Sequence, residues 1–126
     1  MRVAIVGSRR RVDREAVVAV VNELAEGTVV ISGGCVGPDQ WAVAQARARG
    51  LPVEEFVPDT AGCRQRFEFT RRYYERNQRV VDACDRVVAF VAPDRTGGTE
   101  DTIRRALKAG KPVEIRHEVS AARLAS

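Results

Sequence analysis

Short apolar runs, rich in β-branched residues, alternate along this chain with longer stretches in which apolar residues recur every three or four positions. The short runs predict strands, because apolar runs bounded by turn residues are typical of buried strands. We expect five strands, at residues 3–6, 28–31, 53–57, 86–91 and 112–115. The periodic stretches predict four helices: one between Asp13 and Gly27, one from Pro38 to Gly50, one over residues 65–84, and one from Thr99 or Glu100 to Ala109.

Strands that are apolar throughout and alternate with helices indicate a parallel sheet with helices on both faces. Right-handed crossovers between parallel strands then favour a Rossmann-like topology. We therefore expect an α/β fold, a single Rossmann-like three-layer sandwich with a five-stranded, mainly parallel sheet. The domain is expected to span residues 1–116, with residues 117–126 as a short C-terminal tail.

Residues at helix ends and on helix faces refine this prediction. Asp13 is expected to cap the first helix and Gly27 to end it, while Thr99 is expected to be the N-cap of the last helix. The buried face of that last helix is expected to hold Ile103, Ala106 and Leu107. Core packing is also expected for three aromatic residues at helical positions, with stacking of one tyrosine on a base as the alternative: Trp41, Tyr73 and Tyr74.

Length and composition narrow the class of protein. A chain of 126 residues, 44% hydrophobic and 30% charged, is typical of one soluble domain with a sizeable core. Its apolar runs are far shorter than the roughly 20 residues of a membrane span, and its start does not resemble a signal peptide, so a cytoplasmic location is the default expectation. The three cysteines are widely spaced without a CxxC pair, which argues against a disulfide framework and a cysteine-rich zinc site.

Three glycine-bearing turns, each directly after a predicted strand, are the strongest candidates for chemistry. Loops at the carboxyl ends of parallel strands meet at one edge of the sheet, where ligands bind. Glycine permits close approach to the backbone, and the helix that follows offers free N–H groups to an anion. The turns therefore predict a site for a phosphate-bearing small molecule. The candidate binding residues are Gly7, Ser8 and Arg9, then Ser32, Gly33, Gly34, Gly37 and Asp39, then Gly97, Gly98 and Thr99.

Each turn also has an interpretation without a ligand. Gly7 can simply turn the chain while the arginines after it face water. In the second turn the glycines expose several N–H groups in a row, which favours an anion nest. Asp39 either compensates the dipole of the following helix or accepts a hydrogen bond from a ribose hydroxyl or a base. Glu100 and Asp101 are candidate general bases if they point into the cleft, and otherwise only complement the helix dipole.

Charge and missing motifs narrow the ligand. The net charge is +4, and six arginines lie in one stretch: Arg64, Arg66, Arg71, Arg72, Arg76 and Arg79. Such a cluster favours binding of phosphate, on a nucleotide or a nucleic acid, or else forms a solvated helix face. No GxGxxG fingerprint or GxxxxGK[ST] loop occurs, so NAD-type binding and a P-loop are not expected. A single histidine, His117, leaves no basis for a histidine metal pair or a Ser–His–Asp triad, and we expect no metal and no cofactor.

Residues 31–39, residues 76–81 ahead of 85–90, and residues 97–99 together resemble the SLOG superfamily, which takes its name from the Smf/DprA DNA-processing proteins and the LOG cytokinin-activating enzymes. The similarity covers roughly residues 1–115 and is greatest to small stand-alone bacterial and phage members. The resemblance implies a Rossmann-like fold that binds nucleotides or nucleotide-derived ligands at the glycine turns, commonly as a homodimer. It places Arg76 and Asn77 at the nucleotide site.

Three functions stay open at this point. The leading hypothesis is binding of a nucleotide or nucleotide-derived small molecule, as a sensor or processing protein. The alternative is a LOG-like hydrolase that releases the base from a nucleoside 5′-monophosphate, with Arg76 and either Glu100 or Asp101 as catalytic residues; Thr102 stands where the LOG pattern has its glutamate. The second alternative is DprA-like binding of single-stranded nucleic acid through the arginine-rich stretch. No membrane partner is expected.

Overall fold

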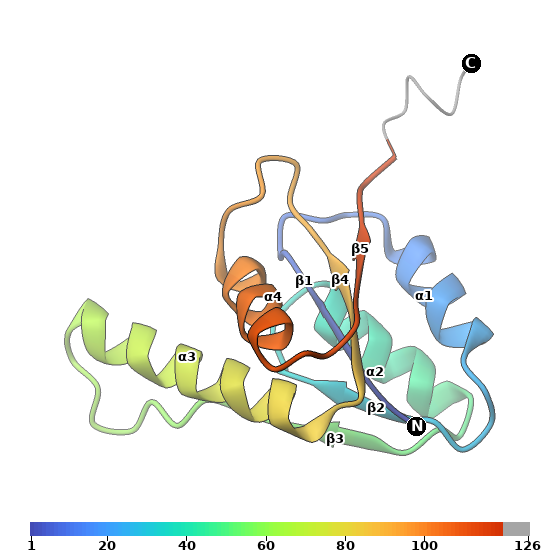
Figure 1. The fold of residues 1–126 in the computed structure, drawn as a ribbon, viewed down its shortest axis with the longest axis horizontal. Helices are drawn as coiled ribbons and strands as arrows, with labels where there is room; N and C mark the ends of the chain where they lie inside the picture. Colours follow the sequence, from blue (N-terminus) through green and yellow to red (C-terminus); the bar gives the residue numbers. More distant parts are fainter. Residues whose placement is uncertain (120–126) are drawn as a thin grey trace.

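The computed structural model describes residues 1–119 and shows a five-stranded sheet between two layers of helices (Figure 1). The strands are β1 (Arg2–Gly7), β2 (Val29–Ser32), β3 (Val53–Glu55), β4 (Arg86–Phe90) and β5 (Val113–Arg116). Their order in the sheet is β3-β2-β1-β4-β5, and every neighbouring pair is parallel. This confirms the predicted α/β class and Rossmann-like sandwich, with a sheet that is wholly rather than mainly parallel.

In the described part of the chain, four helices cover the sheet, two on each face. They are α1 (Arg14–Glu23), α2 (Pro38–Ala48), α3 (Arg66–Ala83) and α4 (Gly98–Lys108). The side chains of β1 alternate between the two faces, since Val3 and Ile5 pack with α1 and α2 while Ala4 and Val6 pack with α3 and α4. Because both faces are covered, the central strands have no polar face, which explains their uninterrupted apolar sequence.

Several local predictions were wrong, and each has a physical reason. Asp13 occupies the N-cap position of α1 as predicted, but its side chain makes no capping hydrogen bond, because it pairs with Arg11 at 2.5 Å. The end of α1 comes at Glu23, ahead of Gly27, and Arg49 donates to the carbonyl oxygens of Val21 and Leu24 there, at 2.6 and 2.9 Å. A long side chain from the residue that follows α2 thus takes the role predicted for a glycine.

The start of α4 also differs from the prediction. Gly97 is its N-cap, so Thr99 lies inside the first turn and is buried. On the predicted apolar face, Ile103 and Ala106 are buried but Leu107 is 62% exposed, because the helix turns it away from the sheet. Trp41 packs partly buried against the core as expected, whereas Tyr73 and Tyr74 of α3 are exposed.

The end of the described chain is fastened by a buried arginine. The guanidinium of Arg11, 2% exposed, donates to the carbonyl oxygens of Val91 and Arg116, which follow β4 and end β5. In the predicted tail, residues 117–119 form neither helix nor strand, and residues 120–126 lie outside the described residues. No helix within residues 1–119 is both long and apolar enough to cross a membrane.

Candidate functional site at the carboxyl edge of the sheet

The three glycine turns lie next to one another, because β2, β1 and β4 are neighbours in the sheet. The first turn lies against the start of α2: a Cβ added to Gly7 would meet the Pro38 Cβ at 2.6 Å. One added to Gly37 would lie 3.2 Å from the Cα of Arg9. Gly7 and Gly37 are therefore required by close packing of the chain on itself, whatever else they do.

Asp39 holds the first and second turns together from the inside. Its side chain is 3% exposed and accepts hydrogen bonds from the backbone N–H of Gly7 at 3.2 Å and of Gly33 at 3.1 Å. Ser32 adds to this closure, since its hydroxyl oxygen accepts the N–H of Gly34 at 3.1 Å. The second turn does bind an anion, but the anion is this chain's own carboxylate. A ribose hydroxyl has no exposed oxygen of Asp39 to bind.

Burial shifts the pKa values of two side chains in and next to this closed turn. Burial raises the pKa of Asp39 to about 6, opposed by the positive charge of Arg76 and by N–H donors that include Cys35. Burial likewise raises the pKa of the Cys35 thiol, and the negative charge of Asp39 adds to this shift. Cys35 is therefore a poor nucleophile near neutral pH, since the thiolate is the reactive form.

Arg76 and Asn77, which follow one another on α3, reach from the second turn to the start of α4. Arg76 is 8% exposed; its Nη1 donates to the carbonyl oxygen of Gly33, and its Nε donates to Oδ1 of Asn77 at 3.0 Å. Asn77 in turn donates to Oδ2 of Asp101 at 3.0 Å and to the carbonyl oxygen of Gly98 at 3.5 Å. The structure thus brings together the residues that the sequence analysis placed near the glycine turns.

Asp101 belongs to the packing between α3 and α4. Its Oδ2 accepts from Asn77 and also from Nε of Arg105 at 2.7 Å. Arg105 continues the network, donating to Gln78 at 3.0 Å and lying over the ring of Tyr74. Thr102, at the position of the LOG glutamate, is 3% exposed and so presents no polar atom to a cleft.

The loop from β4 to α4 is open where the second turn is closed. Gly97 and Gly98 are exposed, and a Cβ on either would meet nothing within 4 Å. Gly97 has φ +105°, a left-handed conformation that favours glycine. No side chain caps the start of α4, and within residues 1–119 the N–H groups of Gly98 and Thr99 have no hydrogen-bond acceptor, whereas that of Glu100 donates to Gly97. This helix start is the part of the site that remains available to an anion.

Ion pairs hold the rest of that loop. Arg10 donates to both oxygens of Asp94, at 3.0 and 2.6 Å, and also to the hydroxyl of Thr96 at 2.9 Å. The Arg10 guanidinium, through its hydrogen bonds, holds the pKa of Asp94 well below its usual range. Arg95 likewise donates to both oxygens of Glu100, at 2.8 and 2.9 Å. The first turn and the fourth-strand loop are therefore tied to each other at the surface.

These contacts bear on the candidate catalytic residues. Both oxygens of Glu100 are engaged by Arg95, and one oxygen of Asp101 carries two hydrogen bonds, which leaves its Oδ1 as the less engaged carboxylate oxygen, 3.9 Å from Arg104. Arg76 is held by Gly33 and Asn77. Within residues 1–119, no three His, Cys, Asp or Glu side chains gather in a way that could hold a metal ion.

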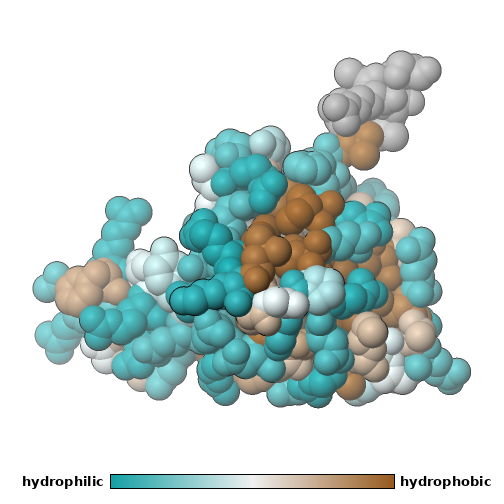
Figure 2. Space-filling model, in the orientation of Figure 1, coloured by the Kyte–Doolittle hydropathy of each residue, from teal (hydrophilic) through white to brown (hydrophobic). Residues whose placement is uncertain are grey.

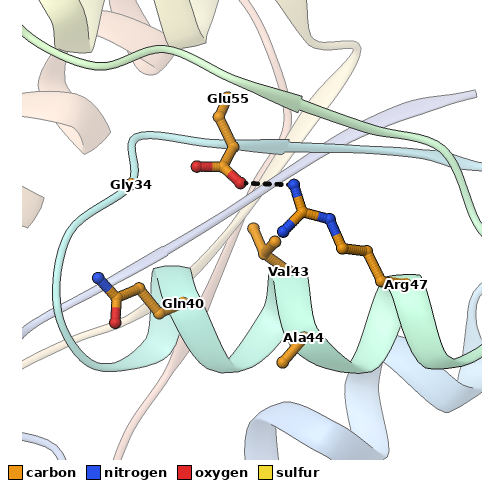
Figure 3. A pocket seen from close by; sticks show the side chains of 6 residues that line it. All are labelled: Gly34, Gln40, Val43, Ala44, Arg47 and Glu55. Atoms are coloured by element: carbon orange, nitrogen blue, oxygen red, sulfur yellow. Dashed lines mark hydrogen bonds and ion pairs between the residues drawn. The ribbon is translucent and has the colours of Figure 1, made fainter.

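A hollow of about 270 Å³ lies beside this edge, between α2 and the end of β3 (Figure 3). Of the predicted binding residues only Gly34 lines it; the others are Gln40, Val43, Ala44, Arg47 and Glu55. The sequence analysis did not single out Glu55, which comes at the carboxyl end of the shortest strand. The predicted strand ran on to residue 57, so Glu55 did not lie at its carboxyl end, whereas β3 ends at Glu55 in the structure.

The arginine-rich stretch divides into two parts. Arg64, Arg66 and Arg71 are exposed on and before the part of α3 that projects from the body of the molecule, whereas Arg76 is buried. Arg79 lies over the ring of Phe56, 4.9 Å from its centre, at the edge of the sheet. Figure 2 shows mostly hydrophilic residues over the projecting part of α3, and a hydrophobic area in the middle of the view, where α4 and β5 lie.

Comparison with known proteins supports the fold. No family model matches the chain, and no curated protein matches it. The chain is similar to the solved structure of DNA processing protein A (DprA) from Streptococcus pneumoniae, with a TM-score of 0.75 and 20% sequence identity. The match covers 99% of this chain and 53% of that chain, so the chain spans about half the length of that protein. The chain therefore has a DprA-like, Rossmann-like fold.

Proposed function

We propose that this protein binds a nucleotide or nucleotide-derived small molecule, with a phosphate at the start of α4. The observation that carries the proposal is a helix start without a side-chain cap, at the N–H groups of Gly98 and Thr99, where Gly98 is exposed. Buried Asn77 donates to the carbonyl oxygen of Gly98 from α3 and is itself bonded to Arg76. Free N–H groups at a helix start and the helix dipole both favour an anion. Because Gly98 has no side chain and open space around it, a phosphate can approach the backbone closely.

Membership of the SLOG superfamily is part of this proposal. It is supported by the DprA-like fold and by the resemblance of residues 31–39, 76–81 and 97–99 to that superfamily. The same resemblance implies a homodimer, which analytical ultracentrifugation of the purified protein tests directly: a sedimenting mass near twice 13.9 kDa is expected.

The proposal is tested by calorimetry with inorganic phosphate, AMP, CMP, cyclic mononucleotides and ADP-ribose. The test variant is Gly98→Leu, whose side chain has open space around its Cβ and so leaves the fold intact, but covers the N–H groups of α4. Ala109→Leu, which adds the same side chain at the exposed other end of α4, is the matched control. We expect at least tenfold weaker binding in Gly98→Leu and none of that loss in Ala109→Leu. Absence of binding by the wild type below millimolar concentration excludes the proposal.

A second candidate is binding of single-stranded nucleic acid, favoured by the exposed arginines of the projecting α3 with Phe67 and Tyr73 among them. Arginines neutralise phosphates and aromatic rings stack on bases. The similar protein named above is a DNA processing protein. This candidate predicts affinity for an oligonucleotide that falls steeply with salt.

The salt dependence is measured on three proteins by fluorescence anisotropy. The double variant Arg64→Gln/Arg71→Gln is expected to lower the slope of log affinity against log salt by about 1.4, at roughly 0.7 for each phosphate that is no longer neutralised. The control variant Arg14→Gln/Lys108→Gln removes the same charge from exposed positions outside α3, and its slope is expected to equal that of the wild type. Equal slopes in all three proteins exclude α3 as the binding surface.

A further inference from the structure

The hollow between α2 and β3 has the lining of a polar subsite. Gln40, Val43, Ala44 and Arg47 follow the spacing of one helical face, so they present an amide, an apolar strip and a guanidinium in a row. Glu55, the last residue of β3, lies opposite them, and Gly34 of the second turn closes one end (Figure 3). Its volume of about 270 Å³ suits a sugar-sized group.

Glu55 has one oxygen held and the other directed at the turn. Its Oε1 accepts from Nη2 of Arg47 at 3.1 Å. Its Oε2 lies 3.8 Å from the place where a Cβ on Gly34 would be, so the missing side chain of that glycine leaves the carboxylate accessible from the turn. The Glu55 side chain is 32% exposed, which keeps it within reach of a ligand. An ionised carboxylate accepts hydrogen bonds only, and the hydroxyl groups of a sugar diol are donors that it can accept beside Arg47.

The sheet sets how far this carboxylate lies from the open start of α4. Glu55 ends β3 and the loop to Gly98 follows β4, and β2 and β1 lie between these strands. Three neighbouring strand spacings of about 4.8 Å amount to roughly 14 Å. This exceeds the span from the 5′-phosphate to the ribose hydroxyls of one mononucleotide. Arg9, exposed at the end of β1, lies between the two positions.

We propose that the hollow holds the terminal ribose of a short ribonucleotide, with Glu55 accepting hydrogen bonds from its 2′,3′-diol. This inference rests on the proposed function, since the phosphate at the other end of the ligand occupies the start of α4. An internucleotide phosphate then passes Arg9. The ligand class is a dinucleotide or a comparably long ribonucleotide with a free diol, in preference to a mononucleotide or a deoxyribonucleotide.

The test compares three ligands by calorimetry: 5′-phosphorylated diadenylate (pApA), the same dinucleotide with a 2′,3′-dideoxy 3′-terminal sugar, and AMP. The wild type is expected to bind pApA at least tenfold more tightly than either other ligand, because hydrogen bonds to a charged acceptor are worth about that much. In Glu55→Ala the preference for the diol is expected to vanish, with the affinity for the dideoxy dinucleotide unchanged. Glu54→Ala is the matched control, since Glu54 precedes it in β3 and pairs with Arg2 instead.

The outcomes separate this inference from the proposed function. If the wild type binds both dinucleotides equally, or if Glu55→Ala keeps the preference for the diol, the ribose subsite is wrong and the phosphate site stands. If Glu54→Ala loses the preference as fully as Glu55→Ala, the effect belongs to β3 as a whole and the assignment of Glu55 is wrong. If no ligand binds, phosphate and AMP included, the proposed function fails together with this inference.

Discussion

Two glycine turns at the same edge of the sheet do opposite things with their backbone N–H groups. In the second turn, the N–H groups of Gly33 and Gly34 donate to Asp39 and Ser32, and this buried carboxylate also accepts the N–H of Gly7. In the turn before α4, Gly97 and Gly98 are exposed and no side chain caps the helix. The difference shows that a glycine-rich turn before a helix favours binding of an anion, and that a carboxylate of the same chain can be that anion.

The largest difference is expected from removing the internal anion. Asp39→Ala leaves the buried N–H of Gly33 and the partly buried N–H of Gly7 without an acceptor, and Arg76 without its counter-charge. At about 1–3 kcal/mol for each buried group left unpaired, we expect the free energy of unfolding to fall by about 4 kcal/mol. Urea denaturation followed by circular dichroism measures it. A loss no larger than that of an average surface substitution contradicts the closed turn.

The next largest difference between the two turns is expected in how stability depends on pH. Because burial raises the pKa of Asp39 to about 6 in the folded protein, the folded state holds this proton more tightly than the unfolded state. Its contribution to stability is therefore fully present below about pH 4 and is lost as the pH rises through about 6, by about 3 kcal/mol in all. Arg76 and Cys35 are the groups that share this environment.

Stability measured from pH 4 to pH 8 in the wild type and in Asp39→Asn checks this dependence. The advantage of the wild type over the variant is expected to be largest at pH 4 and to shrink toward pH 8. A constant difference across this range means that Asp39 keeps an ordinary pKa and is not buried as described. Carboxylates whose pKa is lowered, such as Asp94, contribute equally to both proteins and cancel.

One added methyl group is expected to distinguish the two turns directly. In Gly33→Ala the new Cβ lies 3.1 Å from both Cδ of Arg76 and Oδ2 of Asp39, and we expect a loss of about 2 kcal/mol from this crowding. In Gly98→Ala it meets nothing within 4 Å, and alanine restricts the unfolded chain, so stability is expected to stay level or rise by up to about 1 kcal/mol. Thermal denaturation of both variants measures these changes in stability. Equal losses of stability in the two variants contradict the difference between a closed and an open turn.

The smallest effect is expected in the exposed loop that precedes Gly97. Asp94→Ala removes the pairing with Arg10 and a hydrogen bond from Thr96, but all of these groups are exposed. Surface pairs of this kind contribute little to folding, so global stability is expected to stay within experimental error. Amide hydrogen exchange of residues 94–98 is expected to quicken while that of residues 32–37 does not change. Faster exchange in both turns would mean that they open as one unit.

Much of the fold and part of the site could be predicted from the sequence. The apolar runs and the helical spacing of Val17, Val20 and Val21 are local patterns, and all five strands and four helices occur where these patterns lie. The association of Arg76 and Asn77 with the glycine turns was also predicted, from the resemblance of these motifs to the SLOG superfamily. Helix ends were less predictable, since the last carbonyl groups of α1 accept hydrogen bonds from Arg49, which follows α2.

The partners of the polar residues could not be predicted. Asp39 and Asp101 are both acidic residues in the first turn of a helix that follows glycines, and the sequence does not show which groups each of them contacts. Their hydrogen bonds differ because Asp39 faces the ends of β1 and β2, whereas Asp101 faces Asn77 of α3. Glu55 was overlooked for the same reason. Only the folded structure brings Arg47 within hydrogen-bond distance of one carboxylate oxygen and places Gly34 beside the other.

The sequence by itself determined a Rossmann-like α/β sandwich with glycine turns gathered at one edge, because hydrophobic periodicity and glycine placement are local properties of the chain. Only the tertiary structure decided which turn is closed by its own carboxylate and which is open to a ligand. The physical reason is that a hydrogen bond or an ion pair depends on distance and burial. Both are set by how α2, α3 and α4 pack against the ends of the strands.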